Sequence, residues 1–367
     1  MQDIGRSKRA EKAYSFDDVA IVPSRRTRER LDVDLTWKID ALTLDCPIVA
    51  APMDSCMSVA TAIAVGQLGG LGVLNLEGLW TRYADPQPIL DELAAIKDQI
   101  QATTRLQEVY AAPIDSDLIA QRLAELRASG QPVAGSLSPK NVIAFSGAVE
   151  RAAPDFFVIR GALVSAEHVA SQGTPLDLKR FIRSLDVPVI VGGCANYHTA
   201  LHLMRAGAAG VLVGFGGGAR HATLSVLGIE VPMATAVADV AAARRDYLDE
   251  SGGRYVQVVA DGSLGGSGDI AKALALGADA VMLGAPLARA TEAPGQGYHW
   301  GAEAWHTSLP RGWRSYVGQI GPLSEILRGP SHRADGSMNL VGALAQTLAS
   351  TGYTDLKSFQ RAEVVLL

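Results

Sequence analysis

Eight short apolar runs recur along this chain, most of them stopped by glycine or proline and followed by a segment with helical periodicity. Strands that alternate with helices in this way predict an α/β fold with a parallel sheet. Eight strand–helix units in about 250 residues favour a (β/α)8 TIM barrel over an open doubly wound sheet, which usually carries one glycine fingerprint after its first strand. The expected strands are Pro47–Met53, Leu71–Asn75, Pro132–Leu137, Phe156–Gly161, Val187–Gly193, Gly210–Gly216, Tyr255–Gly262 and Ala280–Gly284.

The 367 residues are expected to form a single barrel domain over 1–367 with four additions to the strand–helix repeat. Residues 1–46 form an N-terminal arm, and residues 80–131 form a helical excursion that delays the third strand. Residues 293–338 are rich in Gly, Pro, Trp, His and Arg and lack periodicity, which is typical of an active-site flap or an oligomer contact. Residues 339–367 form a C-terminal helix and tail.

The composition narrows the class of protein. Hydrophobic residues make up 48% of the chain and aromatic residues only 6%, which suits aliphatic strands buried on both faces. The net charge of −5 argues against a nucleic-acid partner. No apolar run reaches membrane-spanning length and the N-terminus lacks a signal-peptide core, so we expect a cytoplasmic protein that does not enter membranes. Three cysteines without a CxxC pair are expected to be reduced (Cys46, Cys56 and Cys194).

The stretch from Val258 to Gly284 reads VVADGSLGGSGDIAKALALGADAVMLG. It predicts a buried strand ending in Asp261, a glycine-rich turn, a helix and a second buried strand ending in Gly284. Glycines let backbone N–H groups approach an anion closely, and a helix start adds partial positive charge. Two consecutive strand ends of this kind favour a phosphate site over simple connecting turns, with Asp261 placed to bind the hydroxyls of a sugar.

Several motifs resemble the IMP dehydrogenase/GMP reductase family, and the resemblance runs across nearly the whole chain. The ATEAPG segment is similar to the dehydrogenase branch, and residues 80–130 leave no room for the regulatory CBS insert of ordinary IMP dehydrogenases. The chain therefore resembles the short, CBS-less IMP dehydrogenase-related subfamily. The other motifs that carry the resemblance are YSFDDVAIVPSRR (Tyr14–Arg26), PIVAAPMDS (Pro47–Ser55), GGLGVLNLEG (Gly69–Gly78) and VADGS followed by SGDIAKALALGADAVMLG.

This resemblance implies a purine-nucleotide oxidoreductase of GMP biosynthesis that converts IMP to XMP, passes hydride to NAD and uses a covalent cysteine adduct. Asp261 would hold the ribose hydroxyls, Gly284 would line the phosphate, and Met53 would pack against the base. A K⁺ ion in the Gly216–Gly218 loop is a further implied group, and no other metal site is expected. The full implied substrate set is Met53, Gly216, Gly218, Asp261, Gly262, Ser263, Gly284, Ala285 and Tyr298. The implied cofactor set is Arg160, Gly161 and Gly214.

The loop that carries the family's cysteine reads VGFGGGARHAT here, so His221 occupies the cysteine's place and Thr223 matches the threonine beyond it. A thiolate attacks well and also leaves well, whereas a histidine adduct at purine C2 is far less favourable. His221 is interpreted either as a general acid or base, in a set with Thr223 and Asp239, or as an exposed loop histidine. Among the cysteines, Cys194 lies closest to the expected barrel mouth, although a small buried hydrophobe is the favoured interpretation.

Two further positions depart from the family. Dehydrogenases carry an acidic residue and a small polar one where this chain has Arg160 and Gly161. A cation there suits a phosphate, an acidic substrate or an NADP-like ligand, or else it pairs with a local carboxylate. The family's water-activating Arg-Tyr dipeptide is represented only by Arg314 and Tyr316, which are taken as catalytic candidates.

His299 and Trp300, with Trp305 and His306, lack a third convergent metal ligand and favour packing of the flap-like segment or an interface.

The sequence leaves three functions open. The first is IMP dehydrogenase-like chemistry with an altered nucleophile. The second is a catalytically silent protein that binds or senses IMP, XMP or GMP. The third and weaker one is GMP reductase chemistry, which also needs the missing cysteine. Because barrels of this family assemble as tetramers or octamers, the resemblance implies a homo-oligomer.

Overall fold

Eight parallel strands form a closed barrel in the computed structural model, which describes residues 2–4, 6–161, 163–169, 175–214, 222–301, 304 and 314–367. The sheet order is β7-β6-β14-β13-β12-β11-β10-β9-β8. Only Val73 separates β7 from β8; β7 pairs with β6 and β8 with β9, so these two segments are halves of one strand that closes the ring. The (β/α)8 prediction is confirmed. The strands are β6 Ile48–Ala50, β7 Leu71–Gly72, β8 Leu74–Asn75, β9 Ala134–Leu137, β10 Phe156–Arg160, β11 Val189–Cys194, β12 Gly210–Val213, β13 Gln257–Asp261 and β14 Ala280–Leu283.

All eight expected strands are present, but most are shorter than their apolar runs. The sixth run was expected to continue to Gly216, and β12 ends at Val213. Gly214 follows with φ +116°, a backbone conformation that favours glycine and stops the strand. Apolar runs extend beyond strands because residues just past a strand end also pack into the barrel.

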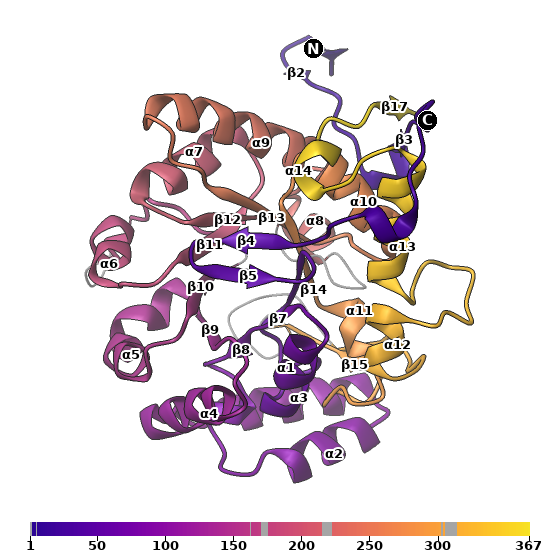
Figure 1. Ribbon diagram of the computed structural model, residues 1–367. Coiled ribbons are helices and arrows are strands. Elements are labelled where there is room, and N and C mark those ends of the chain that lie inside the picture. Colours follow the sequence, from indigo (N-terminus) through magenta and orange to yellow (C-terminus); the bar gives the residue numbers. More distant parts are fainter. Residues whose placement is uncertain are drawn as a thin grey trace.

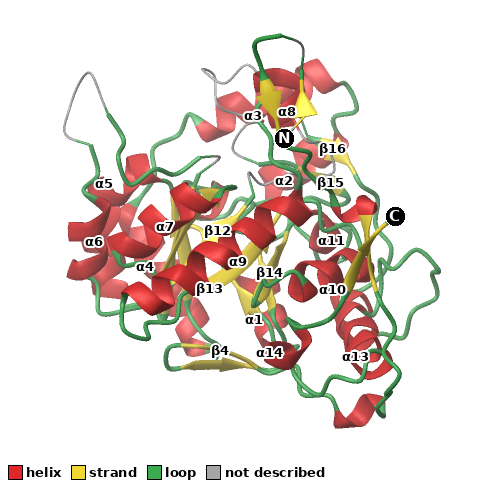
Figure 2. Cartoon of the chain, turned by 90° about the horizontal axis from the view of Figure 1, so that it is seen from above, coloured by secondary structure: helices red, strands yellow, loops and turns green. Residues whose placement is uncertain are grey.

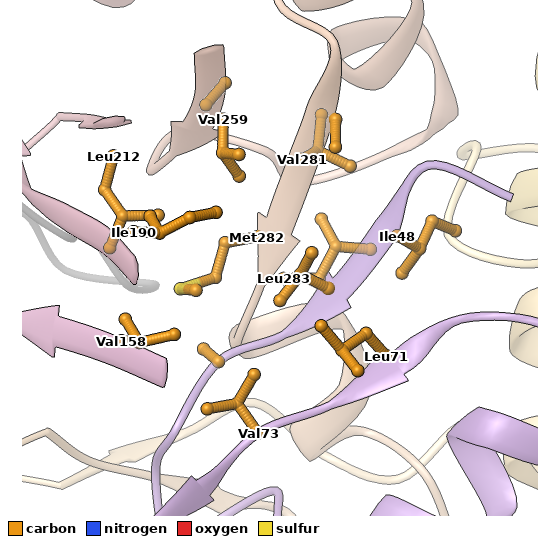
Figure 3. Packing of buried hydrophobic residues seen from close by; sticks show 14 of the residues in the cluster. Ile48, Leu71, Val73, Val158, Ile190, Leu212, Val259, Val281, Met282 and Leu283 are labelled. Carbon is orange, nitrogen blue, oxygen red and sulfur yellow. The ribbon is translucent and has the colours of Figure 1, made fainter. Parts of the chain in front are cut away.

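The barrel interior is aliphatic, as the composition predicts. Figure 3 shows Val158, Ile190, Leu212, Val259 and Met282 close together between the strands, and each is at most 2% exposed. Branched aliphatic side chains from alternate strands fill a barrel in layers, so the interior is a packed core rather than a pore. The open volume available for a ligand therefore lies at the barrel ends.

Helices surround the barrel (Figure 1). Their starts follow from local chemistry: the side chains of Ser58, Asp177 and Asn196 each accept a hydrogen bond from an amide in the first turn. The outer helices are α1 Val59–Gln67, α5 Pro139–Ala152, α6 Leu178–Ser184, α7 Tyr197–Ala206, α8 Ala222–Leu227, α9 Met233–Glu250, α10 Ser267–Ala275, α11 Ala285–Ala288, α12 Leu323–Arg328, α13 Leu340–Ser350 and α14 Leu356–Phe359. The helix expected between the strands that end in Asp261 and Gly284 is present as α10, and the expected C-terminal helix is present as α13.

The excursion at 80–131 is helical, with α2 Gln87–Ala95, α3 Gln99–Tyr110 and α4 Ser116–Ala128. Helix α4 packs against α1 and α5 and so serves as the barrel's own second helix. Helices α2 and α3 form an extra hairpin beside β15 (Tyr298–His299), as Figure 1 shows. A separate apolar cluster joins the hairpin to the segment after the last barrel strand and contains Leu79, Leu90, Leu93, Leu106, Val109, Tyr110, Tyr298, Trp300 and Ala304.

The amino end of the barrel is covered by a hairpin of β4 (Trp37–Ile39) and β5 (Leu42–Leu44). The buried Trp37 indole donates through Nε1 to Gln257, the first residue of β13, at 3.1 Å. Strand β15 pairs with β16 (Ser315–Tyr316). Figure 2 shows β4 at one end of the molecule and α8 at the other, with β15 and β16 between them. The carboxyl ends of the strands therefore face the α8 and β15 side.

The N-terminal arm and the C-terminal tail pair with each other. Strand β3 (Val19–Ile21) pairs antiparallel with β17 (Val364–Leu366), beside each other in Figure 1. Short elements complete the N-terminal arm: β1 Gln2–Asp3, β2 Arg9–Ala10 and the 3-10 turns Phe16–Asp18 and Arg30–Asp32; a third such turn, Leu79–Thr81, opens the excursion. Among the helices described, none has the length and apolar character needed to cross a membrane.

Candidate functional site

The carboxyl ends of the strands form a cleft that gathers several of the predicted site residues. Met53 follows β6, Arg160 ends β10, Asp261 ends β13, and Gly284 follows β14. His299 of β15 closes the cleft from above the strand ends. The cleft, called the Asp261 cleft below, encloses about 30 Å³ and is lined by Ala51, Met53, Arg160, Asp261, Gly262, Leu264, Met282, Gly284, Ala285, Pro286 and His299.

Arg160 and Asp261 form an ion pair across the mouth. Arg160 Nε lies 2.9 Å from Asp261 Oδ2, and Nη2 lies 3.4 Å from Oδ1. The side chains are 19% and 8% exposed, so solvent screens the pair only weakly. Of the two interpretations of Arg160 from sequence, the structure shows the pairing with a local carboxylate.

The ion pair also divides the mouth. Arg160 and Met53 line both the Asp261 cleft and a second cavity of about 70 Å³, called the Asp54 cavity. A water needs a cavity of only about 10–15 Å³, so either space holds water while neither holds a nucleotide. A larger ligand on Asp261 therefore requires the Arg160 side chain to move aside and join the two spaces.

His299 lines the Asp261 cleft, whereas its sequence context favoured packing of the flap-like segment or an interface. Its ring is 5% exposed, and Nδ1 lies 3.0 Å from Ser55 Oγ. Burial, with the neighbouring Arg160 charge, lowers the pKa of His299 to about 4, so the ring is neutral at neutral pH. Gly284 leaves room for it: a Cβ there would lie 3.1 Å from His299 Cε1. The sequence signal was the YHW run (Tyr298–Trp300), two residues after ATEAPG.

The Asp54 cavity holds a hydrogen-bonded chain from three separate elements. The Tyr110 hydroxyl, at the end of α3, donates to Asp54 Oδ2 at 2.5 Å, and Trp300 Nε1 donates to the Tyr110 oxygen at 3.0 Å. Burial raises the pKa of Asp54 to about 6, although hydrogen bonds from Tyr110, the Leu79 amide and Asn75 lower it. Tyr110 was missed because it lies in the excursion, far from any motif. The lining is Pro52, Met53, Asp54, Asn75, Glu77, Tyr110, Ser136, Leu137, Ser138, Arg160, Trp300 and Gly301.

Backbone geometry fixes Asp261 in place. A Cβ on Gly214 would overlap the Asp261 carbonyl, so the neighbouring strand end must be glycine. Gly262 and Ser263 then turn the chain with φ +135° and +54°. Positive φ angles favour glycine, as the glycine-rich turn expected after this strand predicts. Ser263 adopts such an angle at some cost in strain.

Other predicted residues lie elsewhere. The Arg314 guanidinium is fully buried, donates to the carbonyls of Leu93 and Ile96 at the end of α2, and lies 3.9 Å from the centre of the Tyr298 ring. These contacts indicate a structural role for Arg314 and place Tyr298 in packing. Tyr316 is 68% exposed and lines a different pocket. Gly161 extends the pairing of β10 with β11 through Gly193.

The loop in which His221 occupies the position of the family's cysteine lies outside the described residues. Gly216, Gly218 and His221 lie outside the described residues, as does the side chain of Thr223, and so do Trp305 and His306. Asp239 lies within α9, where burial and the Glu11 charge raise its pKa. Among the residues that are described, no three His, Cys, Asp or Glu side chains converge as metal ligands.

All three cysteines are buried, and none provides a thiolate at neutral pH. Burial raises the pKa of Cys46 to about 11 and those of Cys56 and Cys194 to about 12. The thiol of Cys194 donates to the Leu212 carbonyl at 3.3 Å, and those of Cys46 and Cys56 also donate to backbone carbonyls. The interpretation of Cys194 as a buried hydrophobe agrees with this environment.

We expect the native protein to resist a chromogenic disulfide reagent at neutral pH, because only a thiolate attacks such a reagent. The urea-unfolded chain should react at all three cysteines. Time courses of absorbance with and without urea measure this difference. A single cysteine that reacts rapidly in the native protein would contradict it and reveal an activated thiol.

Comparison with known proteins agrees with the fold. A family model described as "IMP dehydrogenase / GMP reductase domain" matches residues 13–317. An "Uncharacterized oxidoreductase" of Mycolicibacterium smegmatis is 50% identical over 368 residues, which cover 98% of each chain. An inosine-5'-monophosphate dehydrogenase of Methanocaldococcus jannaschii is 27% identical over 486 residues, covering 98% of this chain and 93% of that one.

A solved structure is similar throughout its length. The crystal structure of an IMP dehydrogenase/GMP reductase-like protein from Corynebacterium glutamicum superimposes with a TM-score of 0.94 and 50% sequence identity, covering 100% of this chain and 97% of that one. The family model spans most of the chain, and the barrel and its strand-end cleft match that assignment. This chain belongs to the IMP dehydrogenase/GMP reductase family.

Proposed function

We propose that the protein binds a purine nucleoside 5′-monophosphate in the Asp261 cleft and oxidises IMP to XMP with NAD. The observation that carries the proposal is a buried carboxylate, Asp261, at the end of β13, beside the glycine end of β14 in one cleft. Active sites of such barrels lie at this face, with phosphate groups at the seventh and eighth strand ends.

Different residues of the cleft are proposed to contact the ribose, the phosphate and the base. Asp261 accepts hydrogen bonds from the ribose hydroxyls, while Gly262 and Gly284 leave the backbone open to the phosphate. Met53 lies between the Asp261 cleft and the Asp54 cavity, where the base packs against its flexible thioether. In this binding mode Arg160 releases Asp261 and contacts the ligand instead.

The Asp54 cavity fits the nicotinamide end of NAD. Asp54, Asn75 and Ser136 line it with hydrogen-bond donors and acceptors. A ring that carries a carboxamide satisfies groups of this kind. NAD, when bound, supplies the hydride acceptor. The protein's own groups orient the two ligands, and the neutral His299 offers a hydrogen bond in the Asp261 cleft.

A second candidate is nucleotide binding without turnover. The buried, protonated thiols favour it, because family chemistry needs a cysteine nucleophile and position 221 carries histidine. GMP reductase chemistry is weaker for the same reason. Both candidates share the Asp261 cleft, and for both we propose a homo-oligomer, a tetramer or an octamer.

Two measurements on the same preparation separate these candidates. Titration calorimetry with IMP, XMP and GMP measures binding, and NADH absorbance with IMP and NAD measures turnover. Oxidoreduction predicts binding and NADH formation by the wild-type protein. Silent binding predicts the heat of binding with no NADH, and a gain of NADH formation in His221→Cys. Absence of binding by all three nucleotides contradicts both candidates.

A further inference from the structure

A third and larger space adjoins the Asp261 cleft. It encloses about 570 Å³ and is called the Arg289 pocket below. It shares three wall residues with the Asp261 cleft, Leu264, Ala285 and Pro286, so the two spaces adjoin beside Ala285, where the first phosphate is expected. Ligand pockets commonly enclose about 300–1,000 Å³. The lining is Ser15, Phe16, Asp17, Ser263, Leu264, Gly265, Asp269, Ala285, Pro286, Arg289, Tyr316 and Val317.

Arg289 supplies a cation to this pocket. It follows α11 directly, and its backbone carbonyl accepts from Ile320 at 2.9 Å, which fixes the chain there. Its Nε is buried and makes no hydrogen bond within the described chain, where its guanidinium also forms no ion pair. Because Nε is buried, a ligand in the pocket meets the terminal N–H groups of the guanidinium, whose planar shape and charge match phosphate oxygens. Within the described chain this charge has no partner, so Arg289 favours an anion in the pocket.

Two carboxylates on the wall limit what this anion is. Asp269 Oδ2 already accepts from the amides of Gly265 and Gly266, at 3.0 and 3.3 Å, so its charge is partly neutralised by the backbone. Asp17 is exposed to solvent, which screens its repulsion. A free anion gains little in such mixed surroundings, whereas an anion tethered to a ligand already bound next door overcomes them.

We propose that the Arg289 pocket binds the second phosphate of a purine nucleoside 5′-diphosphate. This inference rests on the proposed function, because the first phosphate must lie at Gly262, Gly284 and Ala285. The second phosphate then extends past Ala285 and Pro286 to the Arg289 guanidinium. The protein on this view distinguishes nucleotides by the length of the phosphate chain as well as by the base.

Calorimetric titration of IMP and IDP into the wild-type protein and three variants tests the inference. The wild-type protein should bind IDP roughly ten-fold more tightly than IMP, since one charged hydrogen-bonding pair is gained. Arg289→Gln should bind IMP as the wild type does and lose the preference for IDP. Asp17→Asn should strengthen IDP binding by about three-fold, because a repulsive charge is removed. Arg328→Gln is the control, since that guanidinium contacts the Leu68 carbonyl outside the pocket.

The outcomes are distinguishable. If IMP binds and IDP binds no more tightly in the wild type, or if Arg289→Gln weakens both ligands equally, the Arg289 pocket is not a phosphate site while the proposed function stands. If neither nucleotide binds to any of the four proteins, the proposed function fails first. Melting temperatures of the variants, measured alongside, identify any loss that comes from unfolding.

Discussion

Asp261→Asn is expected to weaken IMP binding about 100-fold. The carboxylate is proposed to accept hydrogen bonds from two ribose hydroxyls, and a charged acceptor strengthens each by about 1.5–3 kcal/mol. An amide of the same size accepts only at its oxygen and carries no charge. Titration calorimetry with IMP measures the loss directly, and unchanged affinity in this variant would contradict the assignment of Asp261.

The same substitution also lowers stability, because it removes the carboxylate from the buried Arg160 pair. Removing one partner of a buried ion pair costs about 3–5 kcal/mol. Asp279→Asn is the matched control: Asp279 pairs with Arg244 at 2.7 Å, with side chains 7% and 8% exposed, at the opposite end of the barrel. Urea unfolding should show a similar loss for both variants. Only Asp261→Asn should lose IMP binding.

Asp54→Asn is expected to stabilise the protein at neutral pH by up to about 3 kcal/mol. Burial raises the pKa of Asp54 from 3.8 to about 6, so the folded state holds this proton more tightly than the unfolded state does. Below about pH 4 Asp54 is protonated in both the folded and the unfolded state, and its carboxyl group does not lower the free energy of unfolding. As the pH rises from about 4 to 6, the unfolded chain ionises first and stability falls. Above about pH 6 the loss in the free energy of unfolding is complete and no longer changes with pH.

Urea unfolding of wild type and Asp54→Asn at several pH values measures this difference. The gain in the free energy of unfolding should be present at about pH 7 and vanish near pH 4. Tyr110→Phe serves as the opposite control, since it removes a hydrogen bond that lowers the pKa of Asp54 and should destabilise the protein at neutral pH. A less stable Asp54→Asn at neutral pH would show that the charged form is favoured. A carboxylate kept at such a cost points to a functional role in the Asp54 cavity.

The barrel was predictable because its signal is repeated. Each strand is a short apolar run between turn residues, and eight weak signals with one spacing agree on one architecture. The position of Asp261 beside Gly284 was predictable for the same reason, since consecutive parallel strands end at the same face. The boundaries were less predictable, as β12 shows by ending three residues before its apolar run does.

Contacts between distant side chains were not predictable from these patterns. Arg160 and Asp261 are 101 positions apart, and their pairing depends on how the barrel aligns strands four and seven. Tyr110 reaches Asp54 from a helix that no motif marks, because the α2–α3 hairpin packs through an apolar cluster rather than through a recognisable spacing. His299 was seen in the sequence, yet only burial and the Ser55 contact reveal its place in the cleft.

A crystal structure of the protein grown with IMP would test the central claim most directly. We predict nucleotide density between the ends of β13 and β14, with the ribose hydroxyls on Asp261 and the Arg160 side chain turned away from that carboxylate. Density for IMP at another place, or an empty cleft with the Arg160–Asp261 pair intact at saturating IMP, would contradict the account.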